Sequence, residues 1–324
     1  MTNIAVLGFG IVGSGVVEVV NAGGVSVKAG QKVIIKKILD IRQFPDSPDK
    51  DKVTADFDSI INDKTISIVV ETMGGCNPAY EYTKQSILAG KSVVTSNKEL
   101  VATHGTELMK LARDHGVSYM FEASVGGGIP IIRPLIQCLA ADEITEIMGI
   151  LNGTTNYILS QMIHKGETFE AALADAQAKG YAERNPEADI EGQDTCRKIA
   201  ILSSLCYGKE VDYKTIPTQG ITKLTLDDIA AAEKRGCVIK LIGTSRKMED
   251  GTIFAEVRPM ELEKGHPLAG VEGVFNSILV KGSVTGDVMF YGRGAGKLPT
   301  ASAVVADIVD IIRNGNNNAP FWEA

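Results

Sequence analysis

Two charged side chains lie on the apolar face of one predicted helix, a position in which they could transfer a proton. On a helix expected from about Gln193 to Tyr207, Asp194 and Lys198 share a stripe with Ile201 and Leu205, because residues three or four apart lie on one helix face. An ionisable pair on an apolar stripe suits acid–base chemistry, since desolvation lowers a lysine pKa towards neutrality. An i,i+4 surface ion pair would have the same spacing. The helix alone leaves both interpretations open.

A second lysine, Lys98, follows a predicted strand from Ser92 to Thr95 within the segment Thr95-Ser-Asn-Lys-Glu99. Open α/β sheets bind their ligands at the carboxyl ends of the strands. We therefore expect Lys98 to project into a cleft at that edge. The alternative for this segment is an ordinary polar loop.

The segment Glu122-Ala-Ser-Val-Gly-Gly-Gly-Ile-Pro130 places a carboxylate beside glycines that expose backbone carbonyls. Oxygen ligands of this kind suit a hard cation. A flexible hinge between two domains would use the same glycines. From the residues alone, the cation site and the hinge are both possible.

The N-terminal run Ile-Ala-Val-Leu-Gly-Phe-Gly-Ile-Val-Gly ends in Gly8, Gly10 and Gly13 at the spacing of a dinucleotide-binding fingerprint. In that motif Gly8 supplies the tight turn, Gly10 lets the backbone approach a pyrophosphate, and Gly13 lets the helix pack closely on the strand. The anion then lies at the helix N-terminus. A helix expected from Ile11 to Val20 completes the pattern, which predicts a dinucleotide ligand.

These residues need a doubly wound sheet to position them. Short apolar runs alternate with helical segments in the first part of the chain, which predicts a parallel sheet. The expected strands are Ile4 to Leu7, Val33 to Leu39, Ile66 to Val70, Ser92 to Thr95 and Val117 to Phe121. Asn77-Pro78 predicts the capped start of a helix over Ala79 to Ala89, and Thr103 and Gly116 bracket the next helix.

The alternation is lost after the glycines near Pro130, so a second domain begins there. An apolar helix is expected at Ile131 to Leu139, followed by a strand from about Glu143 to Leu151 and helices opened by Thr155, Thr168 and Thr225. Two-residue periodicity in Thr252 to Met260 and Phe275 to Tyr291, with a turn at Thr285-Gly286-Asp287, predicts an α+β domain with a mostly antiparallel sheet. We expect a dinucleotide-binding domain at 1–130, a substrate-binding and dimerisation domain at 131–300, and a C-terminal helix and tail at 301–324 that packs back on the first domain.

Composition excludes several function classes. A net charge of -7 over 324 residues, without a basic run, argues against nucleic acid or an anionic membrane as partner. Five cysteines without a C-x-x-C pair fit reduced thiols, and four scattered histidines argue against a zinc site. No apolar run approaches the roughly 20 residues of a membrane span. We expect a cytoplasmic protein that acts on a small metabolite.

Several segments together resemble the homoserine dehydrogenase family over almost the full length. They are the glycine-rich N-terminus, Glu71-Thr-Met-Gly-Gly75, Thr95-Ser-Asn-Lys-Glu99, Glu122 to Ile132, Leu151-Asn-Gly-Thr-Thr-Asn-Tyr-Ile158, Gly180-Tyr-Ala-Glu183, Asp189 to Lys198 and Gly292-Arg-Gly-Ala-Gly296. The resemblance implies NAD(P)-dependent interconversion of L-homoserine and L-aspartate 4-semialdehyde, on the route to threonine, methionine and isoleucine.

The resemblance also implies roles for single residues. Lys198 is expected to exchange the proton at the substrate oxygen, and Lys98 to be a second lysine at the nicotinamide and substrate. Glu183 is expected to receive the substrate ammonium, with Asp194 at the reacting end of the substrate and Asp189 in support. The implied cofactor contacts are Gly8, Gly10, Ile11, Val12, Gly13, Asp40, Arg42, Ser96, Lys98, Gly180 and Gly294. A structural Na or K ion is expected at Glu122 and the backbone of Val125, Gly127 and Ile129.

The choice between NAD and NADP is finely balanced. Asp40 favours a free ribose 2′-hydroxyl, whereas Arg42, Lys50 and Lys52 could meet a 2′-phosphate. We lean to NADP, with Arg42 on the phosphate and Asp40 turned away.

The resemblance implies a homodimer built through the second domain. It also suggests the short form of the family, which we expect to be insensitive to threonine as an allosteric effector. The alternatives are another NAD(P)-dependent dehydrogenase of a small polar oxo-acid, which needs an anion-binding Arg in place of Glu183, and a non-catalytic NAD(P)-sensing module.

Overall fold

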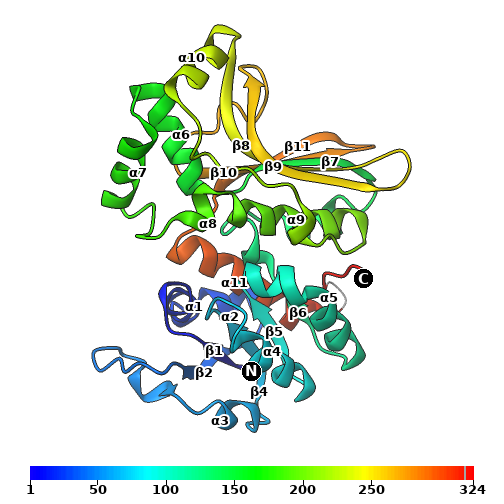
Figure 1. Cartoon of the computed structure of the whole chain (residues 1–324). Coiled ribbons are helices and arrows are strands. Elements are labelled where there is room, and N and C mark those ends of the chain that lie inside the picture. The colour runs from blue at the N-terminus through cyan, green and yellow to red at the C-terminus, as the bar shows by residue number, and fades with distance from the viewer. Residues whose placement is uncertain (317–318) are drawn as a thin grey trace. The chain divides into compact units, whose positions relative to one another are not determined.

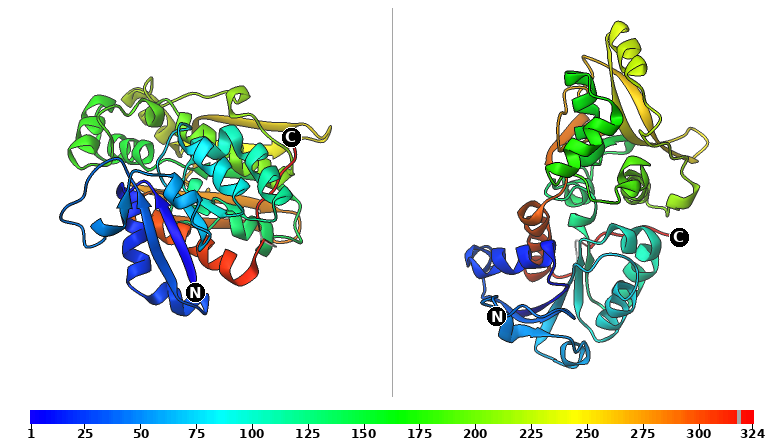
Figure 2. Two further views of the ribbon diagram at one scale, coloured as in Figure 1. Left: turned by 90° about the horizontal axis from the view of Figure 1, so that it is seen from below. Right: turned by 60° about the vertical axis from the view of Figure 1, so that its left-hand side comes forward.

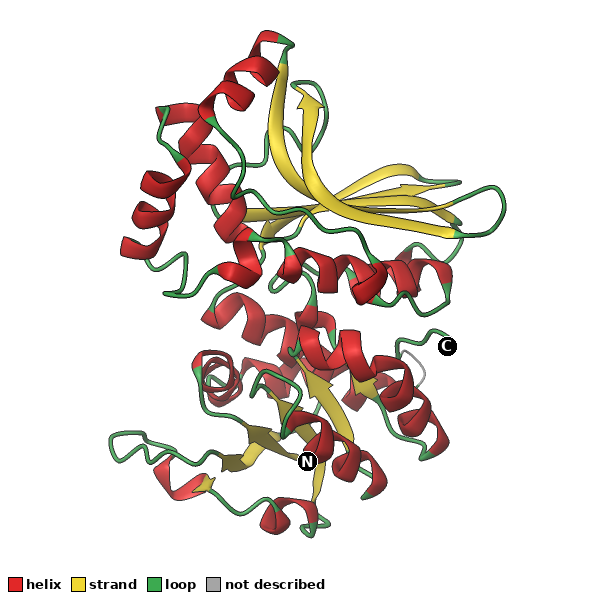
Figure 3. Cartoon of the chain, viewed as in Figure 1, coloured by secondary structure: helices red, strands yellow, loops and turns green. Residues whose placement is uncertain are grey.

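The computed structural model describes residues 1–316 and 319–324. The backbone divides into two compact units, residues 1–137 with 295–324 (unit 1) and residues 138–294 (unit 2). Figure 1 shows their elements in chain order, and Figure 3 separates helices from strands. In the described residues, every helix is too short or too polar to cross a bilayer.

Unit 1 is built on a six-stranded sheet with the order β3-β2-β1-β4-β5-β6. All the pairs are parallel, which is the doubly wound dinucleotide-binding topology. This confirms the predicted fold class. The strands are β1 (Thr2–Leu7), β2 (Val33–Leu39), β3 (Val53–Thr54), β4 (Ile66–Glu71), β5 (Ser92–Thr95) and β6 (Tyr119–Met120).

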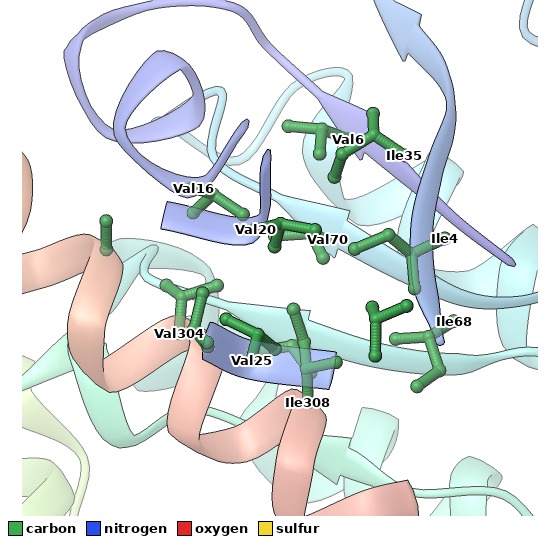
Figure 4. Close-up of a cluster of buried hydrophobic side chains, with 14 of the residues drawn as sticks. Ile4, Val6, Val16, Val20, Val25, Ile35, Ile68, Val70, Val304 and Ile308 are labelled. Carbon is green, nitrogen blue, oxygen red and sulfur yellow. The ribbon is translucent and has the colours of Figure 1, made fainter. Parts of the chain in front are cut away.

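Helices cover both faces of this sheet. One face packs against α1 (Ile11–Asn21), α2 (Gly24–Ala29) and α11 (Lys297–Asn314), and α11 lies beside α1 (Figure 2). Their core includes Val16 and Val20 of α1 and Ile308 of α11 (Figure 4). The helices α4 (Ala79–Leu88) and α5 (Lys98–Asp114) contact the strands β4 to β6, and α3 (Asp58–Ile61) is a single turn.

Unit 2 contains a five-stranded antiparallel sheet with the order β11-β10-β7-β8-β9. Its strands are β7 (Ile144–Ile150), β8 (Cys237–Lys247), β9 (Ile253–Glu263), β10 (Phe275–Gly282) and β11 (Gly286–Arg293). Three helices, α6 (Gly153–Lys165), α9 (Gln193–Tyr207) and α10 (Leu226–Lys234), pack on the sheet, while α7 (Phe169–Ala178) contacts α6 and α8 (Glu187–Ile190) contacts α9. The predicted α+β class of this domain is confirmed.

Several local predictions differ from the structure. The helix expected after Thr103 begins at Lys98, because Asn97 caps it by accepting from Leu100 N. Asn77 does not cap α4, whose N-cap position is Pro78. In place of a regular apolar helix over residues 131–139 there is a π-helical turn at Pro134–Cys138. The strand β8 was not predicted, because it is buried along most of its length and lacks two-residue alternation.

Candidate active site

The glycine-rich turn after β1 has the geometry that the fingerprint predicted. Gly8 adopts a left-handed φ of 93°, and a Cβ added to Gly13 would lie 1.9 Å from Gly8 O. Only glycine at position 13 therefore allows α1 to approach the turn this closely. A Cβ added to Gly10 would meet nothing within 4 Å, so the space beside this backbone is open.

The N-terminus of α1 can receive an anion. The helix starts at Ile11 after Gly10, without a side-chain cap and without an acidic residue in its first turn. Its first N–H groups and its dipole therefore favour negative charge. Ile11 is 73% exposed, which is unusual for a large apolar side chain. These features fit the pyrophosphate of a dinucleotide.

Asp40, at the end of β2, is not turned away as we expected. Its carboxylate accepts from Phe9 N at 2.8 Å and from Arg42 Nε and Nη2 at 3.0 and 2.8 Å. The amide of Phe9 in the glycine turn needs an acceptor, and Asp40 supplies it. The hydrogen bonds with Arg42 hold the pKa of Asp40 at about 2. The Asp40 side chain is 6% exposed and that of Arg42 is 60% exposed, so Arg42 is the more accessible of the two.

Lys98 is the first residue of α5, and a chain of hydrogen bonds fixes the backbone that carries it. Thr95 Oγ1 donates to Glu71 Oε2 at 2.6 Å and accepts from Asn97 N at 2.9 Å. Asn97 in turn caps α5 and donates to Gly75 O at 2.6 Å. Burial raises the pKa of the Glu71 carboxyl. Ser96, on the same loop, is half-buried.

The Glu122 segment is a tightly wound, buried loop within unit 1. Glu122 Oε1 accepts from the amides of Ile131 and Ile132, and Oε2 accepts from Arg133 N, all within 2.8 Å. A Cβ added to Gly126 would lie 2.5 Å from Ile129 O. Glu122 therefore anchors the backbone that leads out of unit 1. The expected partners Val125, Gly127 and Ile129 are also buried.

In unit 2 the structure brings Asp189, Asp194 and Lys198 together. Lys198 is 7% exposed, and its Nζ donates to Asp194 Oδ2 at 2.8 Å and to Leu151 O at 2.7 Å. Asn152 Nδ2 donates to Asp189 Oδ1 at 2.8 Å and to Asp194 Oδ2 at 2.9 Å. The pair is thus buried and is not an exposed surface contact, which decides between the two interpretations of α9.

The remaining predicted residues of unit 2 lie in loops. Glu183 is exposed, and its carbonyl accepts from Gln177 Nε2 at 3.1 Å. Gly180 has a φ of 73° and follows α7. A Cβ added to Gly294 would lie 1.8 Å from Asn276 Nδ2, so this glycine is required for packing against Asn276.

Sequence reasoning assigned no role to two residues that organise these groups. Glu71 and Asn152 both stood in segments of the family resemblance. Glu71 is a lone carboxylate at the end of the apolar run Ile66 to Val70, which was the available signal for it. Asn152 follows β7 and caps α6. An Asn directly before a helix was the available signal, and the expected start at Thr155 obscured it.

The doubly wound sheet with its glycine-rich turn is typical of nucleotide-binding dehydrogenases, and the buried Asp194–Lys198 pair is of a kind that can exchange a proton. The family model described as homoserine dehydrogenase matches residues 130–309, and that of its NAD-binding domain matches residues 8–122. Curated homoserine dehydrogenases are similar over most of the chain. The Synechocystis protein is 45% identical (95% of this chain, 73% of that protein), and the Bacillus subtilis protein is 40% identical (96% and 73%).

Solved structures agree with the sequence comparisons. A homoserine dehydrogenase from Thiobacillus denitrificans superposes with a TM-score of 0.91 at 40% identity, covering 96% of this chain and 73% of that one. A putative homoserine dehydrogenase from Archaeoglobus fulgidus superposes with a TM-score of 0.86 at 30% identity, covering 96% and 99%. A hyperthermophilic archaeal homoserine dehydrogenase in complex with NADPH superposes with a TM-score of 0.80 at 28% identity, covering 95% of this chain and 97% of that one.

The chain belongs to the homoserine dehydrogenase family. It is an oxidoreductase of CH–OH groups with a nicotinamide cofactor, and it interconverts L-homoserine and L-aspartate 4-semialdehyde in amino-acid biosynthesis. The alternatives of another oxo-acid dehydrogenase and of a sensing module are thereby set aside.

Proposed function

We propose that Lys198 is the group that carries the proton in this reaction. In homoserine oxidation a hydride leaves the carbon that bears the hydroxyl, and the nicotinamide, when bound, supplies its acceptor. The hydroxyl proton must leave at the same stage, and Lys198 Nζ accepts it; in the reverse reaction Lys198 returns it to the aldehyde oxygen. The supporting observation is the buried contact between Lys198 and Asp194.

We propose supporting roles for Lys98 and the carboxylates. Lys98, the first residue of α5 and three residues after β5, acts as a second lysine at the nicotinamide and substrate. Asp194 holds the reacting end of the substrate with Asp189 in support, and Glu183 receives the substrate's ammonium group. The exposure of Glu183 supports this role, because an accessible carboxylate can meet a charged ligand.

The assignment of Glu183 is tested by Glu183→Gln. This change removes the charge opposite the ammonium but keeps the size of the side chain. We expect kcat/KM for L-homoserine to fall by about tenfold or more, since a charge-assisted hydrogen bond contributes about 1.5–3 kcal/mol. Affinity for the cofactor should be unchanged. Initial rates with L-homoserine and with hydroxy acids that lack the amino group decide it, and an unchanged kcat/KM for homoserine would reject the role.

We propose NADP as the preferred cofactor, bound at Gly8, Gly10, Ile11, Val12, Gly13, Ser96, Gly180 and Gly294. The accessible Arg42 supports a 2′-phosphate contact, while Asp40 is covered. Lys52 already pairs with Asp49 at 2.6 Å. The archaeal relative was solved with NADPH. Titration of the protein with NADPH and NADH compares the two affinities, and equal affinities would reject the preference.

We propose a structural Na or K ion at Glu122 and the carbonyls of Val125, Gly127 and Ile129. Its support is the buried carboxylate within a wound loop. Three backbone donors already contact Glu122, so we expect the ion to stabilise the loop and not to take part in the reaction. Thermal unfolding in K, Na and choline chloride at equal ionic strength measures this effect, and identical midpoints would exclude the ion.

We propose a homodimer formed through unit 2. The edge strand β11 exposes Met289 and Tyr291, the latter 53% exposed, and exposed large apolar side chains on one sheet are typical of an interface. Sedimentation equilibrium should give twice the mass of the chain. Replacing Tyr291 by Asp should shift the equilibrium towards the monomer.

A further inference from the structure

Asn152 joins the start of a helix to the carboxylates beside Lys198. It is the buried N-cap residue of α6, and its Oδ1 accepts from Thr155 N at 2.9 Å. Its Nδ2 donates to Asp189 Oδ1 at 2.8 Å and to Asp194 Oδ2 at 2.9 Å. The Asn152 amide therefore caps the backbone of α6 and also binds two carboxylate side chains.

The backbone fixes the orientation of this amide. An N-cap must accept from the helix, so the Asn152 oxygen faces Thr155 N and the NH2 group faces the two carboxylates. Both amide hydrogens are needed there, because each carboxylate takes one. Ser, Thr and Asp cap helices as well as Asn does, but none of them offers two N–H donors. The site thus requires Asn and not simply a capping residue.

The same turn holds both members of the buried ion pair. Lys198 Nζ donates to the carbonyl of Leu151, the residue before Asn152, and also to Asp194 Oδ2. The Oδ2 oxygen of Asp194 is therefore shared between the lysine and the Asn152 amide. Because a hydrogen bond to a carboxylate disperses its charge, the amide moderates the attraction of Asp194 for the ammonium of Lys198.

We propose that Asn152 is a positioning residue that fixes Asp194 and Asp189 and sets how tightly Asp194 holds the proton on Lys198. This inference rests on the proposed role of Lys198 as proton carrier. Asn152 acts through Asp194 and has no direct contact with the reacting atoms in this account.

The groups around Lys198 come from several elements of unit 2. Asp194 lies on α9, the same helix as Lys198, and Leu151 O follows β7. Asp189 belongs to α8 and is joined to Asp194 through the side chain of Asn152. The strand β8 presents Gly243 to Ile199, and β9 presents Val257 to Gly192. Among these contacts, Asp194 meets the lysine directly, and Asp189 meets Asn152, which joins the two carboxylates.

The test is Asn152→Asp, which keeps the size and the helix cap but exchanges two donors for a third negative charge. We expect kcat for L-homoserine oxidation near neutral pH to fall about tenfold or more. We expect the acidic limb of the kcat–pH profile to move up by about one unit, because added negative charge favours the protonated amine. A folded Asn152→Asp protein with a wild-type pH profile would overturn the proposal.

Two further variants separate this role from helix capping. Asn152→Ser keeps a capping oxygen but loses both N–H donors to the two carboxylates, so kcat should still fall severalfold while the melting temperature changes little. Thr225→Ala, which removes the cap of α10, should lower the melting temperature and leave the pH profile unchanged. If Asn152→Asp fails to fold, a wild-type kcat in Asn152→Ser contradicts the proposal.

The role of the lysine is checked separately with Lys198→Ala. If this variant is nearly inactive while the Asn152 variants match the wild type, only the inference about Asn152 fails. If Lys198→Ala keeps a wild-type kcat, the proton-carrier role fails and the inference about Asn152 fails with it.

Discussion

Lys98 in unit 1 and Lys198 in unit 2 are held by partners of different kinds. The backbone around Lys98 is fixed by hydrogen bonds that run from the buried Glu71 through Thr95 to Asn97. The ammonium of Lys198 donates hydrogen bonds directly to Asp194 and to Leu151 O. A charge in direct contact controls whether a lysine is protonated, whereas a distant carboxylate that orders a loop controls where it lies.

The helices that carry the two lysines strengthen this contrast. Lys98 is the first residue of α5, where the helix dipole disfavours a positive charge. Lys198 lies in the second turn of α9, and the dipole favours its partner Asp194 in the first turn. Both sites also rely on an Asn that caps a helix, Asn97 in one and Asn152 in the other. The contacts of Lys198 therefore act on its charge, whereas those near Lys98 act on its position.

The largest expected effect is that of Lys198→Ala. We expect kcat to fall on the order of 10²- to 10⁴-fold, because loss of a general acid or base has that effect. NADPH affinity, measured by the fluorescence of the bound cofactor, should persist. The surface variant Lys234→Ala serves as control and should match the wild type. A wild-type-like kcat in Lys198→Ala would remove the contrast between the two lysines.

A smaller effect is expected from Thr95→Val, which removes the hydroxyl between Glu71 and Asn97 while keeping the shape of the side chain. The buried carboxylate then loses a donor, at a cost of about 1–3 kcal/mol in unfolding free energy. We expect kcat to fall by about tenfold or less without a change in its pH profile, since only placement is disturbed. Urea unfolding and steady-state rates across pH measure both quantities.

Thr83→Val is a matched control for that variant. Thr83 is buried in α4, and its hydroxyl oxygen lacks a hydrogen-bond partner among the residues that the structure describes. Its replacement should therefore leave stability unchanged or raise it. If Thr83→Val and Thr95→Val lower the free energy of unfolding equally, the hydrogen bonds of Thr95 with Glu71 and Asn97 do not stabilise the segment before Lys98.

The smallest expected effect on kcat comes from a change at the cofactor site, which leaves the chemistry at both lysines unaltered. Arg42→Ala should weaken NADP binding by about tenfold or more and NAD binding much less, since a charged contact with a phosphate contributes about 1.5–3 kcal/mol. Arg235→Ala, which breaks an exposed pair with Glu261, is the control. Equal changes in the Kd values of NADP and NAD would show that Arg42 does not contact the 2′-phosphate.

Much of unit 1 could be predicted from the sequence because its signals are local. A buried parallel strand is a continuous apolar run, and Gly8 and Gly13 follow β1 at a spacing that only a tight turn and a close helix explain. The strand bounds Val33–Leu39 and Ser92–Thr95 agree with the structure. The start of α5 was missed because Asn97 belongs to a polar segment in which several residues could act as a cap.

Long-range contacts explain what the sequence concealed. The strand β8 contains Lys240 at a buried position, where its Nζ donates to Val271 O at 2.6 Å, so the pattern of a buried strand is interrupted. Asp40 faces the Phe9 amide, 31 residues away in sequence. Asn152 reaches Asp189 and Asp194 across about forty residues. Such pairings depend on how the elements fold together, which periodicity within one segment cannot reveal.

The most direct test of the central claim is a double-mutant cycle on kcat for L-homoserine oxidation with Lys98→Ala, Lys198→Ala and both changes together. If the two lysines act in one chemical step, the double variant should lose much less than the product of the two single losses. Losses that multiply fully would show that the lysines act independently and would contradict the account.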